Sequence, residues 1–432
     1  MNGLRARGLC VAVAGALAWA GAAVGATGAS GSTRAEHLPA GFADTLVATM
    51  DRPIALAPTP DGRILVADQS GVVRVIDATG ALLAAPALDI SAQVCAENSE
   101  RGLLGLAVDP QFATNGFVYL FYTHKLFVKC KRDIADVPVN RVARFTMTGN
   151  TIDPTSEKVL LDGMTSFHGN HNAGDLGFGN DGFLYVSVGD GGCDLRVGPT
   201  ACDPDNAISQ STDTVQGKVL RITRTGGIPK GNPFTGAGTV RCNRGGPAPA
   251  GKQCREIYMY GLRNPFRFAF DPNAAGTRLF VNDTGEATWE EVNDAVAGAN
   301  YGWNVREGDC ATGSTTDCGP PPAGMTNPVY AYSHAATGCG AITGGAFVPD
   351  GLWGAADDGG YLLSDYVCSR ISLLTPKAGG GWKSKVFARG LALGGPIELR
   401  FAPYHGTTAL YYTTYTVDQT HGEVHVITRN PG

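Results

Sequence analysis

His171 is the first residue whose type and position indicate chemistry. It lies in SFHGNHNAGDLGFGNDGFLYVSVGDGG, residues 166–192, directly before a stretch that alternates like a β-strand. A neutral imidazole there can take a proton from a hydroxyl group, so His171 is a candidate general base. His168 is close by in the chain, and Asn170 or Asp190 can orient an imidazole. The alternative is that His171 only caps a turn or hydrogen-bonds a loop.

A second polar cluster occupies EIYMYGLRNPFRFAFDP, residues 256–272. Arg263 and Asn264 precede Pro265, which favours an extended Asn264 and places both polar residues at the start of a strand. Arg263 can neutralise an anionic group or a developing oxyanion. The alternative for Arg263 is a structural ion pair between neighbouring units of the fold.

The third cluster is acidic and lies in DTGEATWEEVNDAVAGANYGWN, residues 283–304. Carboxylates and exposed carbonyl groups in a loop suit Ca²⁺, although the DxDxDG spacing of an EF-hand is missing. Composition alone favours a solvated acidic turn. The carboxylates of this segment are Asp283, Glu286, Glu290, Glu291 and Asp294.

Several other functions are excluded by what the chain lacks. It contains no GxSxG, no HExxH and no phosphate-binding loop. The net charge is −5 and the isoelectric point is near 5.9, so we expect no nucleic-acid partner.

A strand–turn–strand pattern recurs along the chain and must position these residues. The 60 glycines and 25 prolines indicate turns and not helices. Repetition of this kind predicts an all-β, six-bladed propeller, and the alternative is one large β-sandwich or two sandwiches. A propeller places its site at one mouth of the central channel. The six units cover 54–76, 103–123, 174–188, 267–281, 344–363 and 397–413, with third strands at 140–145, 217–222, 370–374 and 422–427.

The N-terminus predicts export. Two arginines precede an apolar run that ends in small residues, as in a secretory signal peptide covering 1–26. A linker, 27–39, and the propeller, 40–429, follow in this interpretation. A membrane anchor is disfavoured because glycine and alanine interrupt the apolar run. We therefore expect a secreted or periplasmic protein with no membrane insertion after cleavage.

Ten of the eleven cysteines follow the predicted signal peptide, because Cys10 falls within it. An even number in an exported chain indicates disulfides. The sequence alone does not determine their connectivity, but pairing of sequential neighbours would staple the long loops. Those pairs are 95–130, 193–202, 242–254, 310–318 and 339–368.

Four ordered motifs extend this interpretation to a family. They are ERGLLGLAVDPQF (100–112), NHNAGDLGFGNDGFLYVSVGD (170–190), YGLRNPFRFAFDP (260–272) and EEVNDAVAGANYGWN (290–304). With them, the chain resembles the glucose/sorbosone dehydrogenase family, whose soluble members use pyrroloquinoline quinone (PQQ) and calcium. The cysteines and the phrases GLRNPFRFAFDP and GANYGWNVREG are more similar to its hedgehog-interacting-protein-like branch.

The resemblance implies a role for each polar residue. PQQ would lie across the channel mouth, and His171 would take the proton of the sugar C1 hydroxyl while hydride moves to PQQ. Arg263 falls beside the quinone oxygens, with Asn264 as its neighbour. Glu100 falls where the classical enzymes have a glutamine near the substrate, and Asn170 replaces the aspartate that flanks the base.

The resemblance also implies two calcium sites. One would use the backbone carbonyls of Gly285 and Glu286. The second would use the Glu291 side chain and the Tyr301 carbonyl.

The chain departs from the family where PQQ carboxylates are bound. The family's lysine and arginine pair are missing from LLSDYVCSRISLL and GGPIELRFAP, where Gly395 and Ile397 stand near the arginine positions. Arg370 or Arg400 is a possible substitute. The leading prediction is a PQQ- and Ca²⁺-dependent aldose dehydrogenase that passes electrons to an external acceptor. The main alternative is a non-catalytic propeller that binds a glycan or a protein, and a Ca²⁺-dependent hydrolase is a weaker third.

Overall fold

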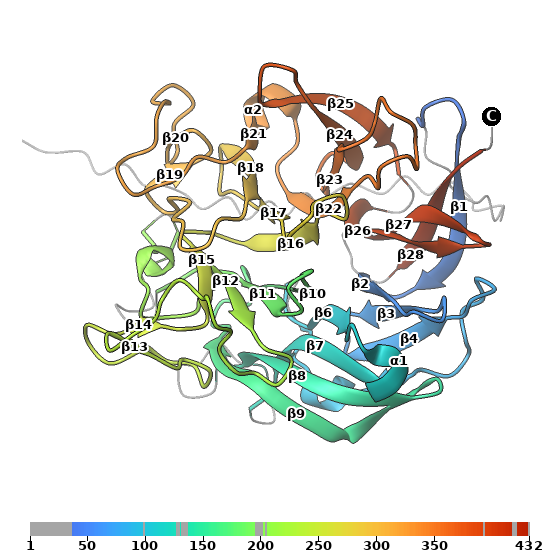
Figure 1. Ribbon diagram of the computed structural model, residues 1–432, viewed down its shortest axis with the longest axis horizontal. Helices are drawn as coiled ribbons and strands as arrows, with labels where there is room; N and C mark the ends of the chain where they lie inside the picture. The colour runs from blue at the N-terminus through green and yellow to red at the C-terminus, as the bar shows by residue number, and fades with distance from the viewer. Residues whose placement is uncertain are drawn as a thin grey trace, which may run out of the picture. The chain divides into compact units, whose positions relative to one another are not determined.

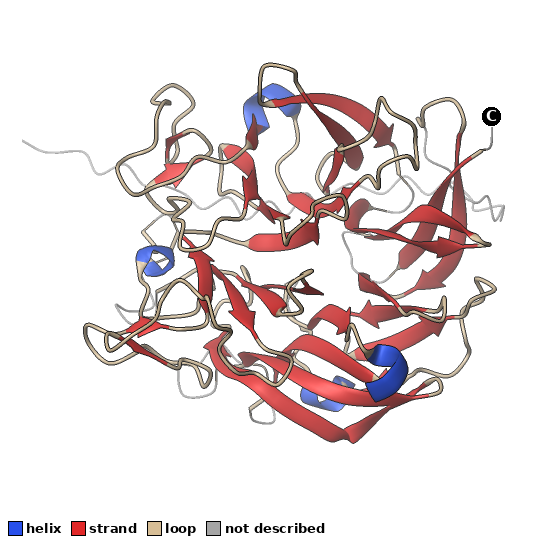
Figure 2. Cartoon of the chain, viewed as in Figure 1, coloured by secondary structure: helices blue, strands red, loops and turns tan. Residues whose placement is uncertain are grey.

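The computed structural model describes residues 37–97, 100–126, 130, 137–194, 202–203, 205–391, 394–416 and 421–430. The predicted signal peptide, 1–26, lies outside these residues. Strands dominate, and the α-helices are single turns (Figure 2), so the all-β prediction is confirmed. Within the described residues, no helix is both long and apolar enough to cross a lipid bilayer.

Six four-stranded antiparallel sheets form the blades of a propeller. The first three blades are β2 (Pro53–Pro58), β3 (Ile64–Asp68), β4 (Val72–Ile76), β5 (Leu88–Asp89); β6 (Leu103–Val108), β7 (Phe117–His124), β8 (Val139–Thr148), β9 (Thr151–Thr165); and β10 (Ala173–Phe178), β11 (Leu184–Val188), β12 (Lys218–Ile222), β15 (Ile257–Tyr260). The last three are β16 (Pro265–Phe270), β17 (Leu279–Asp283), β18 (Trp289–Asp294), β21 (Tyr330–Ser333); β22 (Ile342–Phe347), β23 (Tyr361–Asp365), β24 (Arg370–Pro376), β25 (Trp382–Arg389); and β26 (Gly395–Tyr404), β27 (Thr407–Tyr415), β28 (Gly422–Arg429), β1 (Phe42–Met50).

The blades close into a ring (Figure 1). Each first strand contacts the first strand of the next blade, in the order β2, β6, β10, β16, β22, β26 and back to β2. The N-terminal strand β1 pairs with β28, so the last blade contains strands from both ends of the described chain. The predicted six-bladed propeller is confirmed.

The small elements lie in the connections between strands. They are the pairs β13 (Thr239–Val240) with β14 (Gln253–Cys254) and β19 (Arg306–Glu307) with β20 (Cys310–Ala311), and the helices α1 (Phe112–Asn115) and α2 (His334–Thr337).

Blade packing explains the apolar strands. Every residue of β3 and of β11 is buried, because a second strand in the ring is covered on both faces by other blades. The inner strands approach still more closely. A Cβ atom at Gly105 in β6 would lie 2.0 Å from the carbonyl oxygen of Gly174 in β10, so only glycine fits there.

A buried ion pair joins the inner strands. Arg267 of β16 is 1% exposed, and its Nε donates to Glu398 of β26 at 2.7 Å. Its Nη2 donates to the carbonyl of Ile54 at 2.7 Å and to that of Leu104 at 3.2 Å. One guanidinium therefore connects four of the six blades across the channel.

The predicted disulfide pairing is confirmed in full. The structure pairs Cys95–Cys130, Cys193–Cys202, Cys242–Cys254, Cys310–Cys318 and Cys339–Cys368. Bridges of this kind are typical of proteins that fold in an oxidising compartment.

We predict that Arg267→Ala lowers the free energy of unfolding by about 3–5 kcal/mol, because it removes one of the two arginine partners of the buried Glu398 and leaves the carbonyls of Ile54 and Leu104 without this donor. Arg278→Ala is the matched control: Arg278 is 38% exposed in its pairs with Asp271 and Asp294, and its loss is expected to cost less than about 1 kcal/mol. Denaturant unfolding of both variants measures the difference. Equal losses would contradict a structural role for the channel pair.

Candidate active site

The residues singled out in the sequence gather at one end of the channel. His171 and Asn264 precede the inner strands β10 and β16, and Thr343 lies at the start of β22. Thr284 follows the second strand β17, and Tyr415 ends β27. Antiparallel blades bring the starts of first strands and the ends of second strands to the same rim.

The backbone at His171 is held in an unusual conformation. His171 has φ +50° and Ala173 has φ +52°, values that cost non-glycine residues about 1–3 kcal/mol. Two contacts hold this turn: the His171 N–H donates to the Glu100 carboxylate at 2.6 Å, and its carbonyl accepts from Gly191 at 3.1 Å. Strain that neighbouring contacts maintain is common at functional sites.

Asp190 orients the His171 ring. Nδ1 lies 2.8 Å from Asp190 Oδ1, and the ring is 6% exposed. Asp190 also accepts from the Gly192 N–H at 2.7 Å and from Trp303 Nε1 at 2.9 Å. A carboxylate held in this way accepts the Nδ1 proton and leaves Nε2 as the basic atom. No described residue hydrogen-bonds Nε2.

Asn170 is not the orienting residue. Its side chain faces Gly192, and its Oδ1 is buried without a donor among the described residues. Of the two orienting groups that the sequence suggested, the structure brings Asp190 to His171.

Arg263 pairs with an acid that sequence reasoning missed. Its Nη2 lies 2.8 Å from Asp203, and Nη1 donates to the Gly285 carbonyl at 2.7 Å and to the Thr284 carbonyl at 3.2 Å. Asp203 Oδ2 is also 3.5 Å from His171 Nδ1. The guanidinium and the imidazole therefore share one carboxylate.

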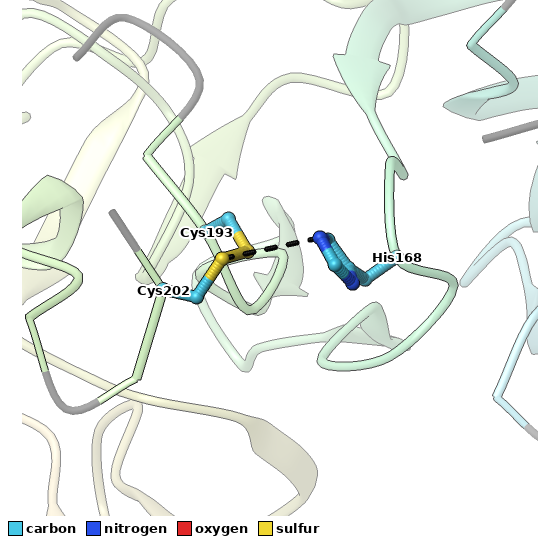
Figure 3. Close-up of side chains that lie close together, drawn as sticks. All are labelled: His168, Cys193 and Cys202. Carbon is cyan, nitrogen blue, oxygen red and sulfur yellow. Dashed lines mark hydrogen bonds between the residues drawn. A yellow bond between two sulfur atoms is a disulfide. The ribbon is translucent and has the colours of Figure 1, made fainter. Parts of the chain in front are cut away.

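His168 belongs to a different contact (Figure 3). Its Nε2 lies 3.9 Å from Sγ of Cys202, which is bonded to Cys193. Since both sulfurs are in a disulfide, this group offers no thiolate for a metal. The bridge instead anchors the residue before Asp203. The only sequence signal for Asp203 was its place beside a cysteine.

Asn264 links the groups of the rim. Its Oδ1 accepts from the Ala173 N–H at 3.1 Å, its Nδ2 donates to Glu100 at 3.4 Å, and its backbone N–H donates to Asp283 at 2.7 Å. Glu100, Asn264 and His171 are thus brought together, as the sequence motifs suggested.

The rim carries more acidic than basic side chains, and their charges contribute to the shifted pKa values of the rim residues. Burial and Arg263 act to lower the pKa of His171, but Asp190 and Glu100 raise it, and the net pKa is above the usual value. Burial and the charge of Asp190 raise the pKa of Asp203 to about 6. Burial raises the pKa of Asp283 to about 7, against the hydrogen bonds it accepts.

A cavity of about 200 Å³ opens beside Glu100. No lysine, arginine or histidine is among its described lining residues. Arg400, a possible substitute, does not line this cavity, and its guanidinium donates to Glu398 at 2.9 Å. Arg370 does not line the cavity either. The walls are Glu100, Asn264, Phe266, Thr284, Ala341, Ile342, Thr343, Tyr366, Ile397 and Tyr415.

The acidic segment is not the solvated turn that composition favoured. Glu290 and Glu291 are buried in β18. Glu291 accepts from the Gly308 N–H at 2.6 Å and from Asn293 Nδ2 at 3.1 Å, while Asn293 Oδ1 is buried without a donor among the described residues. Burial and Asp283 raise the pKa of Glu291. A buried carboxylate beside an unpartnered amide oxygen suits a hard cation such as Ca²⁺.

The other predicted calcium ligands are less clearly arranged. The Gly285 carbonyl accepts from Arg263, and Glu286 is exposed. The Tyr301 hydroxyl donates to the Asp294 carbonyl, whereas the predicted ligand of Tyr301 is its backbone carbonyl.

The fold and the rim define a sugar-dehydrogenase-like propeller. The family model described as "Glucose / Sorbosone dehydrogenase" matches residues 50–353, so the chain belongs to the glucose/sorbosone dehydrogenase family.

Similar proteins support this assignment. The HIPL1 protein of Arabidopsis thaliana is 26% identical over 87% of this chain and 60% of its own length. Quinoprotein glucose dehydrogenase B of Acinetobacter calcoaceticus is 27% identical over 60% of this chain and 51% of its own. The apo aldose sugar dehydrogenase of Escherichia coli shares the fold, with a TM-score of 0.70 and 23% identity over 90% of this chain and 99% of that one. The chain spans less than two thirds of the curated relatives' length.

We predict that millimolar Ca²⁺ raises the Tm of the protein by about 2–5 °C, because a cation compensates the buried Glu291 charge. Glu291→Gln is expected to remove this response. Glu286→Gln is the matched control, since its side chain is exposed and its predicted role uses only the backbone carbonyl. Thermal unfolding with Ca²⁺ and with EDTA measures the response, and an unchanged Ca²⁺ shift in Glu291→Gln would rule out this ligand.

Proposed function

We propose that the protein is an exported sugar dehydrogenase that oxidises an aldose at C1 to its lactone, with PQQ as hydride acceptor. The observation that carries the proposal is the hydrogen bond of 2.8 Å between His171 and the buried Asp190 at the channel mouth. This pair holds one ring nitrogen and leaves the other to take a proton. A histidine that only filled a turn would not need a buried carboxylate that the Gly192 N–H and Trp303 Nε1 hold in place.

The chain's own residues perform the proton transfer. His171 Nε2 takes the C1 hydroxyl proton, and Asp190 stabilises the resulting imidazolium through Nδ1. Asp203 adds negative charge 3.5 Å from the same nitrogen. Arg263 limits that charge by pairing with Asp203, and it supplies positive charge near the reacting oxygen.

PQQ would accept the hydride. The rim residues suit the quinone oxygens of PQQ better than they suit its carboxylates. Arg263 and Asn264 stand beside His171 and suit the quinone oxygens. Of the hydroxyls of Thr284, Thr343 and Tyr415 in the cavity lining, the first two already donate to the carbonyls of Ile342 and Pro396, at 2.9 and 2.6 Å, which leaves Tyr415 to donate to a carboxylate. A hydroxyl supplies a hydrogen bond without charge, so we expect weaker binding than a cationic cradle gives.

Relatives and covalent structure support the remaining parts of the proposal. A similar protein is named a quinoprotein glucose dehydrogenase, and another an aldose sugar dehydrogenase. The five disulfides agree with export to an oxidising compartment, as the N-terminal segment predicts. Electrons would leave to an external acceptor, since the chain has no CxxCH haem motif.

One observation favours a second function. The described cavity lining contains a carboxylate and no cationic side chain, which opposes a tricarboxylate cofactor. Relatives of this chain include the hedgehog-interacting proteins of mouse and human. A non-catalytic propeller that binds a glycan or a protein is therefore the second candidate.

The test is reconstitution with PQQ and Ca²⁺ followed by dye-linked turnover on a panel of aldoses. We expect turnover, and we expect His171→Gln to lower kcat by about 10²–10⁴-fold because the base is lost. His37→Gln, at an exposed histidine, is the control and should retain activity. No quinone absorbance change and no turnover with any aldose would reject the dehydrogenase and leave the glycan- or protein-binding function.

The base also predicts a pH profile. Since the pKa of His171 is raised, kcat/KM should fall as the pH drops through a value above 6.5, where the ring becomes protonated. Asp190→Asn removes the largest of the groups that raise this pKa, so the limb should move to lower pH while the maximal rate falls. Steady-state rates from about pH 5 to 9 measure both effects. If the acidic limb of the profile stays at the same pH in Asp190→Asn, this limb reports the titration of a group other than His171.

A further inference from the structure

Glu100 is the one charged side chain in the cavity lining, and its two oxygens are used unequally. Oε2 accepts from the His171 N–H at 2.6 Å and from Asn264 Nδ2 at 3.4 Å. No donor among the described residues contacts Oε1. The side chain is half-buried. A carboxylate that keeps one oxygen open to a cavity favours a cationic ligand group.

The cavity walls strengthen this preference. Phe266, Tyr366 and Tyr415 line it, and the ring centres of the two tyrosines are 6.0 Å apart. The negative faces of aromatic rings attract ammonium groups. The cavity volume of about 200 Å³ has room for a single monosaccharide ring.

The surrounding charges point the same way. Arg263 is engaged by Asp203 and by two backbone carbonyls, so part of its positive charge is already neutralised. Arg52, on the first blade, donates to the Ala96 carbonyl at 3.2 Å. The carboxylates that act on Arg263 are Asp203, Asp190, Glu100 and Asp283, which outnumber the basic groups Arg263 and His171.

We propose that this mouth selects aldoses with an ammonium group next to the reacting carbon, that is, 2-amino-2-deoxy sugars, and that Glu100 binds the ammonium. The inference rests on the proposed function, because His171 must receive the C1 hydroxyl. Glu100 accepts the backbone N–H of the residue that supplies the base. In this proposal a sugar with O1 at the His171 imidazole presents its C2 substituent to Glu100, the carboxylate that lies 2.6 Å from the His171 backbone nitrogen.

The test compares three probe sugars by calorimetry or ligand-observed NMR, without cofactor, at about pH 6.5 where the amine is charged. Glucosamine should bind about tenfold more tightly than glucose, as one charge-assisted hydrogen bond provides. N-acetylglucosamine, which lacks the charge, should lose this advantage. High salt should reduce the margin, because it screens a half-exposed ion pair.

Glu100→Gln should abolish the margin between glucosamine and glucose. Glu97→Gln, an exposed carboxylate three residues earlier, is the matched control and should keep it. Circular dichroism verifies that both variants are folded, and the wild-type comparison stands even if one variant is not.

The outcomes separate the two proposals. Equal affinities for glucosamine and glucose in the wild type, or a margin that survives in folded Glu100→Gln, would overturn the role of Glu100 and leave the dehydrogenase intact. Binding with the expected margin but without PQQ-dependent turnover would overturn the dehydrogenase and keep an amino-sugar site. Binding of no sugar would overturn the amino-sugar site, and the dehydrogenase would then be decided by turnover with PQQ alone.

Discussion

The ion pair between Arg267 and Glu398 is the constraint on which the arrangement of the inner strands depends. An arginine that is 1% exposed must satisfy its donors inside the protein, and Arg267 does so with Glu398 and with carbonyls of two further blades. The contacts lie in the channel, between strands that are far apart in the sequence. They set the relative positions of β2, β6, β16 and β26, and the rim residues stand at the ends of these strands or of their neighbours.

The rim itself is organised by an excess of carboxylates over basic groups. Asp190 and Asp203 hold His171 and Arg263 in one network, and Asp283 receives the backbone N–H groups of Arg263 and Asn264. The disulfide of Cys202 anchors the chain beside Asp203, so a covalent staple in a long loop helps to position the charge partner of Arg263. The same excess of acid is the basis for the proposed proton-accepting role of His171 and for the proposed cationic substrate.

Family resemblance and local pattern predicted the candidate reactive residues and named Asp190 as one of two possible partners of His171, but they did not predict Asp203. The motif around His171 located the base, and the motif around Arg263 located the arginine. Asp203 was missed because it directly follows Cys202 in a loop with no periodicity from which a contact can be inferred. Glu290 and Glu291 were expected in solvent because their segment is rich in acid, whereas the structure pairs β18 between β17 and β21 and buries both side chains. Arg400 was considered for a cofactor, but its neighbour Glu398 holds it in the channel.

The sequence by itself determined the blades and the family, because strand alternation, turns and ordered motifs are properties of short segments. It suggested the pairing of sequential cysteines, which the structure then decided. Only the tertiary structure decided which acid meets which base. That choice depends on ring closure, which brings Glu100 of the second blade to the backbone of His171 before the third and to Asn264 before the fourth. His171 is a plausible base from its local sequence; its hydrogen bond to the buried Asp190, and the carboxylate of Glu100 beside it, follow from the way the loops fold back on the rim.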